Sequence, residues 1–290
     1  MSWSEGGRCF QLIERDRDRA LRVCVTEAPS RSRAKRQLRV SIDTDARNAT
    51  PMDDAVVDQI IARLRITLGL DLDLSGFYEM CQDDDTLSIV PKIGAGRMIR
   101  SASMTENILK ALCSTNVNWT QAVKMINRLC QLGPNLTHFR NLSAWPTPRE
   151  ILRGGKKYLS GVCRLGYRCD SILKFCDDVA GGKLDPESFD LLAADPAVSS
   201  DDLVKILREI DGIGPTSANY LIGFLGRHDR LAIDSATYAH VAEHHTGGKK
   251  PTAKKIERIY ARYGKWKNKA AWLENWLTWS TARGLIEEGG

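Results

Sequence analysis

One stretch decides the fold: Leu203-Val-Lys-Ile-Leu-Arg-Glu-Ile-Asp-Gly212-Ile213-Gly214-Pro215-Thr216-Ser-Ala-Asn-Tyr-Leu-Ile222. Apolar residues recur at helical spacing on both sides of its two glycines, at Leu203, Ile206, Leu207, Ile210, Ala218, Leu221, Ile222 and Leu225. Gly212 and Gly214 permit a positive φ and a close backbone approach, and Pro215 suits a first helical turn. The stretch therefore predicts a helix, a tight Gly-x-Gly turn and a second helix.

Such a turn presents backbone N–H groups at the positive end of a helix, where an anion binds well. A Gly-x-Gly turn also joins helices that bind nothing, so the turn alone does not identify a site. The additional feature is Asp234, which follows the short apolar run Leu231-Ala232-Ile233. We expect this carboxylate to be partly buried near the second helix.

The order of these residues resembles a known family. Ile-x-Gly-Ile-Gly, then alanine, then an apolar-Asp step about twenty residues later is similar to the helix-hairpin-helix DNA glycosylases with a Gly/Pro-rich loop and a catalytic aspartate, the HhH-GPD superfamily. The resemblance implies that Asp234 is catalytic. It also implies that the hairpin holds the DNA backbone, through Gly212, Ile213, Gly214, Thr216 and Ser217. In relatives, hairpin carbonyls can also hold a Na⁺ or K⁺ ion that bridges to a phosphate.

Bifunctional relatives carry a lysine two residues beyond the second hairpin glycine. That lysine attacks the sugar and allows strand cleavage through a Schiff base. This sequence has Thr216 at that position, and Lys205 and Lys174 lie elsewhere in the pattern. The resemblance therefore implies a monofunctional, hydrolytic enzyme without AP-lyase activity, which leaves an abasic site.

The composition sets the broad class. A chain of 290 residues is long enough for two modest domains, and a formal net charge of +6 suits a nucleic-acid partner. The sequence has no apolar run of membrane-spanning length, and its first residues lack the apolar core of a signal peptide. We expect a soluble, intracellular and monomeric protein, located in the cytoplasm or nucleoid if the source is a prokaryote.

The eight cysteines form no Cys-x-x-Cys pair, and none follows Cys176. We expect free thiols in place of a disulfide framework, with Cys163, Cys169 and Cys176 buried or half-buried on a helical segment. Several relatives bind an iron–sulfur cluster through four cysteines just beyond the catalytic domain. Because this sequence lacks those cysteines, it predicts no iron–sulfur cluster and no other cofactor.

The N-terminal region alternates between apolar and polar residues. Arg22-Val-Cys-Val-Thr26 and Gln37-Leu-Arg-Val-Ser-Ile42 predict strands with one buried face, joined by a basic connection over residues 27–36. The predicted fold class is mainly α with a small N-terminal antiparallel β-sheet (α+β). We expect a β domain over residues 1–50 and a two-lobed helical body over 51–290, with lobes at about 105–232 and at 51–104 plus 233–290.

Two amphipathic helices are predicted to flank a polar break at residues 114–118. Asparagine and serine compete for backbone hydrogen bonds, so one interpretation is a helix, a cap and a helix. Alternatively, Cys-Ser-Thr-Asn116-Val-Asn118 is similar to the asparagine loop with which 8-oxoguanine glycosylases fill the gap left by an extruded base. That resemblance implies that the amides of Asn116 and Asn118 contact base edges.

A second turn carries Leu165-Gly166-Tyr167-Arg168 just before another predicted helix. The same string is found in 8-oxoguanine glycosylases at the turn that kinks DNA. The resemblance implies that Tyr167 acts as a wedge and that Arg168 contacts a phosphate or base. A core position for Tyr167 is the alternative.

Two features near the C-terminus are less specific. His240 and His244 lie four residues apart on one helical face, but no third zinc ligand of known spacing is evident, so no metal site is predicted there. The densest basic region, residues 249–269, either steers DNA or forms a solvated lysine face.

Breaking a base–sugar bond develops positive charge on the sugar, which a nearby carboxylate stabilises. The target nucleotide must be flipped out of the duplex, and we expect it to enter a pocket between the two helical halves. The sequence therefore predicts a base-excision-repair DNA glycosylase that acts on double-stranded DNA with a damaged or modified base. The asparagine loop favours the 8-oxoguanine branch, but the missing lysine leaves alkylated and deaminated bases open. A non-catalytic helix-hairpin-helix DNA-binding module and a modified-base-processing enzyme on the same scaffold are the alternatives.

Overall fold

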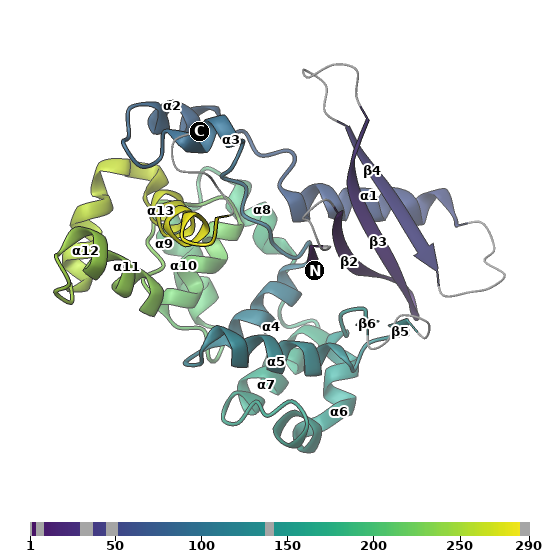
Figure 1. The fold of residues 1–290 in the computed structure, drawn as a ribbon. Coiled ribbons are helices and arrows are strands. Elements are labelled where there is room, and N and C mark those ends of the chain that lie inside the picture. Colours follow the sequence, from purple (N-terminus) through teal and green to yellow (C-terminus); the bar gives the residue numbers. More distant parts are fainter. Residues whose placement is uncertain (1, 4–8, 30–36, 45–51, 137–141, 285–290) are drawn as a thin grey trace. The chain divides into compact units, whose positions relative to one another are not determined.

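The computed structural model describes residues 2–3, 9–29, 37–44, 52–136 and 142–284. The chain forms two compact units, whose elements are labelled in Figure 1. Unit 1 comprises Met1–Arg63 and Leu112–Leu184, and unit 2 comprises Leu64–Ala111 and Asp185–Gly290. Two helices, α1 (Asp54–Leu68) and α4 (Met104–Ser114), pass from one unit to the other.

Unit 1 contains an antiparallel sheet in the order β1-β2-β3-β4. Its strands are β1 (Ser2–Trp3), β2 (Cys9–Asp16), β3 (Arg19–Ala28) and β4 (Gln37–Thr44). Leu12 of β2 pairs with Val23 of β3, and alternate residues of both strands are buried, as side chains with a period of two require. Both strands predicted from alternation are confirmed within β3 and β4, whereas the basic connection lies mostly outside the described residues.

The sheet is tied to the helices of its own unit. Nε of Arg63 on α1 donates to Glu14 of β2 over 2.7 Å. Arg15 of β2 makes two hydrogen bonds, of 2.7 and 3.0 Å, to Glu150, which also forms a capping box with Thr147 at the start of α6 (Pro148–Gly161). These bonds place the strands and the neighbouring helices in one unit.

The rest of the described part of unit 1 consists of helices, their connections and a short hairpin, β5 (Asn135–Leu136) and β6 (Leu142–Ser143). Its other helices are α5 (Trp119–Cys130) and α7 (Arg168–Ala180). The three cysteines predicted to be buried, Cys163, Cys169 and Cys176, are buried free thiols. Burial raises the pKa of Cys163 to about 11 and that of Cys176 to about 12, so both remain protonated and inert.

The described part of unit 2 is helical. Its elements are α2 (Ser75–Gln82), α3 (Ile89–Ile93), α8 (Ser188–Ala194), α9 (Ser200–Arg208), α10 (Pro215–Phe224), α11 (Ser235–His245), α12 (Ala253–Tyr260), the 3₁₀ helix η1 (Ala261–Trp266) and α13 (Lys267–Thr281). Aromatic and aliphatic side chains from α2, α11, α12 and α13 form its core, among them Phe77, Val241, Tyr260 and Leu273.

The predicted fold class, mainly α with a small N-terminal antiparallel sheet, is confirmed. The unit boundaries differ from the predicted domains: residues 1–50, predicted as a separate β domain, fall in unit 1 together with residues 112–184, and residues 185–232 belong with the C-terminal helices. The reason is a pair of long-range bonds: Asn268 of α13 donates its backbone N–H to the carbonyl of His228 over 2.9 Å, and its side chain accepts the Ala232 N–H over 2.9 Å. Within the described residues, no helix has the length and apolar character needed to cross a membrane.

Candidate active site

The predicted hairpin is formed by α9 and α10 in unit 2. Ser199 caps α9, and the chain turns through Gly212, whose φ is +87°. Ile213 is buried, and its N–H bonds the carbonyl of Ile210 over 3.0 Å. Gly214 differs from the expectation for both glycines, since its φ of −86° and ψ of 176° are extended and open to any residue. The backbone therefore requires glycine at Gly212 but not at Gly214.

The first turn of α10 lacks a side-chain cap. Gly214 is the N-cap and has no side chain to offer, whereas Ser199, Asp234 and Thr252 cap α9, α11 and α12 through side-chain oxygens. The N–H groups of Thr216 and Ser217 have no acceptor inside the helix, because they belong to its first turn. A Cβ built on Gly214 meets no described atom within 4 Å. The first turn of α10 thus offers two N–H groups beside open space.

One face of α10 holds the segment that leads to Asp234. The Thr216 hydroxyl donates to the carbonyl of Ile233 over 3.1 Å, and the Asn219 amide donates to the carbonyl of Leu231 over 2.7 Å. Tyr220 completes the set by donating its hydroxyl to Asp234 Oδ2 over 2.9 Å. These side chains lie three and four residues apart and so share a helical face.

Asp234 is half-buried and is the N-cap of α11. Its Oδ1 accepts the Thr237 backbone N–H over 2.8 Å and the Thr237 hydroxyl over 2.9 Å. Burial raises the pKa of Tyr220 well above its ordinary value, with a further contribution from the carboxylate, so its hydroxyl stays protonated and donates. Both carboxylate oxygens are therefore fixed in orientation, and Asp234 lies next to α10 as predicted.

Helix capping alone also explains an aspartate at this position, because aspartate is a preferred N-cap. What capping does not require is the bond from Tyr220 to the second oxygen, which comes from a different helix. A carboxylate oriented by two helices and kept partly out of water can stabilise a positive charge that develops close to it.

The asparagine loop lies in unit 1. Asn116 is exposed, adopts a left-handed φ of +49°, and donates its amide to the Tyr167 hydroxyl over 3.1 Å. Asn118 is the N-cap of α5, and its side chain accepts the Gln121 N–H over 2.9 Å. The capping interpretation thus describes Asn118, whereas Asn116 forms a polar pair with Tyr167.

The Leu-Gly-Tyr-Arg turn lies beside that loop. Tyr167 is 65 % exposed, which contradicts the alternative of a core position. Arg168 is only 6 % exposed, and its guanidinium donates to the carbonyls of Thr115 (3.0 Å, from Nε) and Leu165 (3.2 Å). Its guanidinium carbon also lies 4.5 Å from the centre of the Tyr167 ring. The direct DNA contact predicted for Arg168 does not fit this burial; the bonds favour a role in holding the loop against the turn.

Sequence reasoning missed four side chains at these two places. Asn219, Tyr220 and Thr237 hold Asp234 and its segment, and the helical spacing of the first two from Thr216 is the signal that points to them. Trp119, the first residue of α5, is 75 % exposed, and nothing in its spacing distinguishes it from a core tryptophan.

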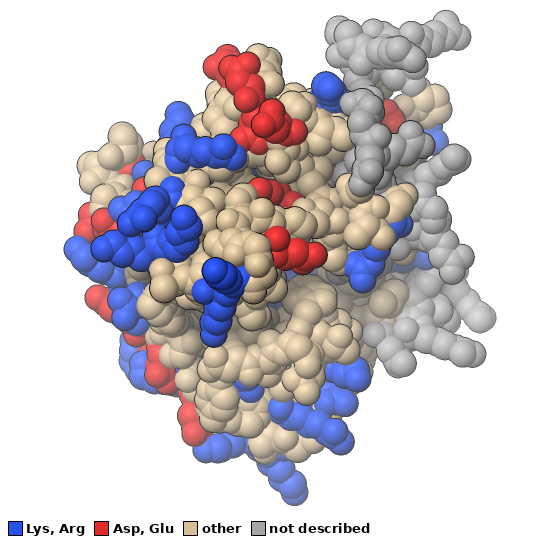
Figure 2. Space-filling view, turned by 60° about the vertical axis from the view of Figure 1, so that its left-hand side comes forward, with Lys and Arg blue, Asp and Glu red and all other residues tan. Residues whose placement is uncertain are grey.

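The basic region divides into an exposed and an internal part. Figure 2 shows Lys and Arg side chains gathered where the helices at the left of Figure 1 come forward, and exposed basic residues of α12 and its flanks include Lys249, Lys250, Lys254, Lys255 and Arg258. Lys269 faces inward instead, and its ammonium donates to the carbonyl of Gly96 over 2.7 Å. Burial lowers the pKa of Lys269 to about 8.

Comparison with known proteins identifies solved structures that have a similar fold. No protein-family model matches the chain, and no curated protein matches its sequence. Among solved structures, MBOgg1 in complex with a low-affinity DNA ligand is similar at a TM-score of 0.71 and 19 % identity, over 98 % of this chain and 88 % of that one. The 3-methyladenine DNA glycosylase from Archaeoglobus fulgidus is similar at a TM-score of 0.70 and 18 % identity, over 94 % of this chain and 87 % of that one.

A third similar structure is the Clostridium acetobutylicum 8-oxoguanine glycosylase/lyase with double-stranded DNA that contains cytosine opposite 8-oxoguanine. Its TM-score is 0.66 at 15 % identity, over 98 % of this chain and 88 % of that chain. At these identities the likeness shows the fold. The chain therefore has the fold of these DNA glycosylases, as the resemblance in the hairpin predicted.

Proposed function

We propose that the protein is a DNA glycosylase that hydrolyses the bond between a damaged or modified base and its sugar in double-stranded DNA. The observation that carries the proposal is the placement of Asp234. Its carboxylate accepts hydrogen bonds from Tyr220 of α10 and from Thr237 of α11. The segment before it is held by α10, and the first turn of α10 lacks a side-chain cap. Anion binding at the hairpin and cation stabilisation by the carboxylate that α10 holds are thus offered side by side.

In the proposed reaction, the bond between the sugar C1′ and the base nitrogen breaks, and its electron pair leaves with the base. The Asp234 carboxylate stabilises the positive charge that develops on the sugar. Water then adds to C1′ and loses a proton to Asp234, which passes it to the departing base, and the products are the free base and an abasic strand. The phenol of Tyr220 and the N–H of Thr237 keep the carboxylate oriented throughout.

DNA would be held by the first turn of α10. The free N–H groups of Thr216 and Ser217 suit a phosphate oxygen at the positive end of the helix. Hairpin carbonyls at Gly212 to Gly214 would accept a Na⁺ or K⁺ ion bridging to the same phosphate. In unit 1, the exposed pair Asn116 and Tyr167 suits the gap left by the flipped base, and the amide can read a base edge.

A panel of duplexes tests the proposal, each carrying a single oxidised, alkylated or deaminated base. After incubation with the full chain, alkali reveals abasic sites as strand breaks. We expect breaks in at least one duplex, and its lesion identifies the substrate. Binding to all duplexes without any break would instead favour a non-catalytic DNA-binding module.

Gly214→Ala tests the DNA contact. The added methyl meets no described protein atom, so we expect the melting temperature to fall by only a few degrees, because alanine is a poorer N-cap than glycine; a phosphate close to the first turn of α10 would be obstructed. We expect DNA binding to weaken about 10-fold, a loss of about 1.4 kcal/mol. Gly76→Ala is the matched control, because its Cβ also meets nothing within 4 Å. Equal affinity in both variants would place the DNA backbone elsewhere.

Tyr220→Phe tests the orientation of Asp234. The variant removes only the hydroxyl that donates to Oδ2, and hydrogen bonds to charged groups contribute about 1.5–3 kcal/mol. We expect single-turnover base release to slow about 10-fold while the Kd for DNA stays the same. Tyr78→Phe is the control, since that hydroxyl donates to the Ala95 carbonyl over 2.8 Å in the same unit. A weaker Kd with an unchanged rate would show that Tyr220 supports binding and not chemistry.

A further inference from the structure

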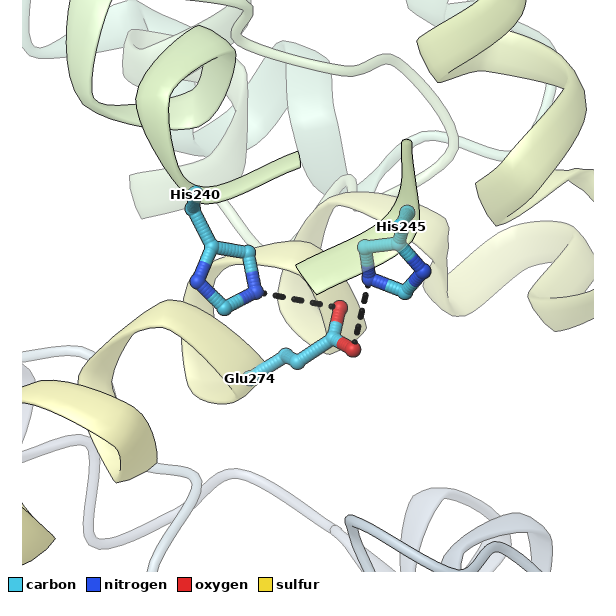
Figure 3. A group of neighbouring side chains, drawn as sticks. All are labelled: His240, His245 and Glu274. Carbon is cyan, nitrogen blue, oxygen red and sulfur yellow. Dashed lines mark hydrogen bonds and ion pairs between the residues drawn. The ribbon is translucent and has the colours of Figure 1, made fainter. Parts of the chain in front are cut away.

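A second cluster of chemically active side chains lies at the other end of α11. His240 and His245 come from the last turns of this helix, and Glu274 reaches them from α13. Figure 3 shows the two imidazole rings and the carboxylate pointing toward one another. One ligand atom from each residue lies within 4.8 Å of the other two.

The distances within this cluster suit one small cation. Nε2 of His245 lies 2.9 Å from Glu274 Oε1, and Nε2 of His240 lies 3.6 Å from Oε2. Bonds of about 2.0–2.2 Å in a tetrahedral zinc site place neighbouring ligand atoms about 3.3 Å apart. The two separations, each measured to a different oxygen of Glu274, lie on either side of that value. All three ligand atoms lie within 4.8 Å of one another, so a bound ion would draw the widest pair together; the His245 side chain is 22 % exposed.

The cluster also contains a buried polar atom without a close hydrogen bond, whose one partner in the cluster is the Glu274 carboxylate at 3.6 Å. Nε2 of His240 is buried and makes no hydrogen bond to any described residue, and the side chain is 4 % exposed. Buried polar atoms are nearly always hydrogen-bonded, so an atom left in this state calls for a ligand. It points to the carboxylate of Glu274, which is itself 8 % exposed. A buried carboxylate is costly unless a cation compensates its charge.

Two neighbouring features support a bound cation. The Tyr260 hydroxyl donates to Glu274 Oε2 over 2.5 Å, the kind of hydrogen bond that orients a metal-ligating carboxylate from outside the ligand set. The cluster also lies at the C-terminal end of α11, where the helix dipole favours positive charge.

We propose that His240, His245 and Glu274 bind a transition-metal ion of the zinc class. Two imidazole nitrogens and one carboxylate oxygen form a ligand set that zinc uses, with water in the fourth position, whereas Ca²⁺ and Mg²⁺ prefer oxygen ligands. The ion would join the last turns of α11 to α13. Asp234 precedes the first turn of the same helix, so the metal would fix the helix that carries it. The site does not depend on the proposed glycosylase activity.

Sequence spacing alone does not reveal this set, because Glu274 lies 29 residues beyond His245. The adjacent His244 is the residue that sequence spacing would pair with His240 in place of His245. It lies on the same turn and its ring centre is 4.6 Å from that of His240, but it is more exposed and offers no atom to the cluster.

Zinc binding by the full-length chain tests the proposal. The protein is treated with a chelator, dialysed against micromolar Zn²⁺ and desalted, and its metal content is measured by mass spectrometry. We expect about one zinc ion per chain and a rise in melting temperature of about 5 °C at saturating metal. His240→Gln and His245→Gln should lose at least about four-fifths of the bound zinc and the thermal shift.

Two control variants make the result specific. His244→Gln should bind zinc as the wild type does, and so should Cys24→Ser, which removes a thiol in unit 1 that lies near Cys9. His245→Gln keeps the test decisive if His240→Gln or Glu274→Gln fails to fold, since the His245 side chain is partly exposed. No zinc in the wild type, or equal zinc in His244→Gln and His245→Gln, would overturn the proposal.

Discussion

Asp234→Asn is expected to reduce single-turnover base release by about 10³-fold or more, a loss of about 4 kcal/mol of transition-state stabilisation. The substitution removes the negative charge and replaces the oxygen that accepts the Tyr220 hydroxyl with an NH₂ group. Asparagine caps helices as well as aspartate does, so the bond from the Thr237 N–H of α11 to the side chain of residue 234 is retained and the fold is preserved. Because the hairpin turn is unchanged, we expect the Kd for DNA to stay within about 3-fold of the wild type.

The matched control is Asp195→Asn. Asp195 is an exposed aspartate of the same unit whose Oδ1 also accepts a backbone N–H, that of Ala197, over 2.8 Å. Its rate of base release should equal that of the wild type. If Asp234→Asn released base at the wild-type rate, Asp234 would be a helix cap and no more, and the proposed mechanism would be wrong.

Borohydride is expected to trap no covalent adduct between the wild-type chain and a substrate duplex. Trapping requires an amine that has replaced the base on the sugar as a Schiff base. The position where bifunctional relatives carry that amine is Thr216, whose hydroxyl is bonded to the Ile233 carbonyl. The product strand should therefore remain intact until alkali is added.

Thr216→Lys supplies the positive control. It places an amine on the face of α10 that holds the segment before Asp234, and we expect an adduct to appear in this variant. An adduct with the wild type would contradict hydrolytic chemistry. Lys269→Gln would then be the first variant to examine, because burial lowers the pKa of Lys269 to about 8, although that side chain is enclosed and bonded to Gly96.

Local rules predicted most of the fold. Alternation identified the strands in β3 and β4, and helical periodicity with Gly, Pro and cap residues identified α9, α10 and the helices on both sides of the asparagine loop. The grouping of the elements into two units was harder to predict from the sequence. It depends on bonds such as those of Asn268 to His228 and Ala232, which join residues 36 or more positions apart.

The candidate site was predictable where its residues are neighbours in sequence. The hairpin and Asp234 follow from a contiguous pattern, whereas the bond from Tyr220 to Asp234 requires the geometry of two helices. For Arg168, the sequence pattern predicted the position but not the role. A sequence pattern identifies an arginine at a turn. Only the structure shows that its guanidinium is buried and donates hydrogen bonds to the carbonyls of Thr115 and Leu165. Glu274 joins the two histidines only once α13 is folded against α11.

The most direct test of the account is mass spectrometry of both products after a single turnover on the duplex that the lesion panel identifies. We expect one equivalent of free base and a full-length strand that carries a hydrated abasic sugar, both lost in Asp234→Asn. A strand that still carries its modified base after complete binding by the wild-type chain would contradict the proposed function.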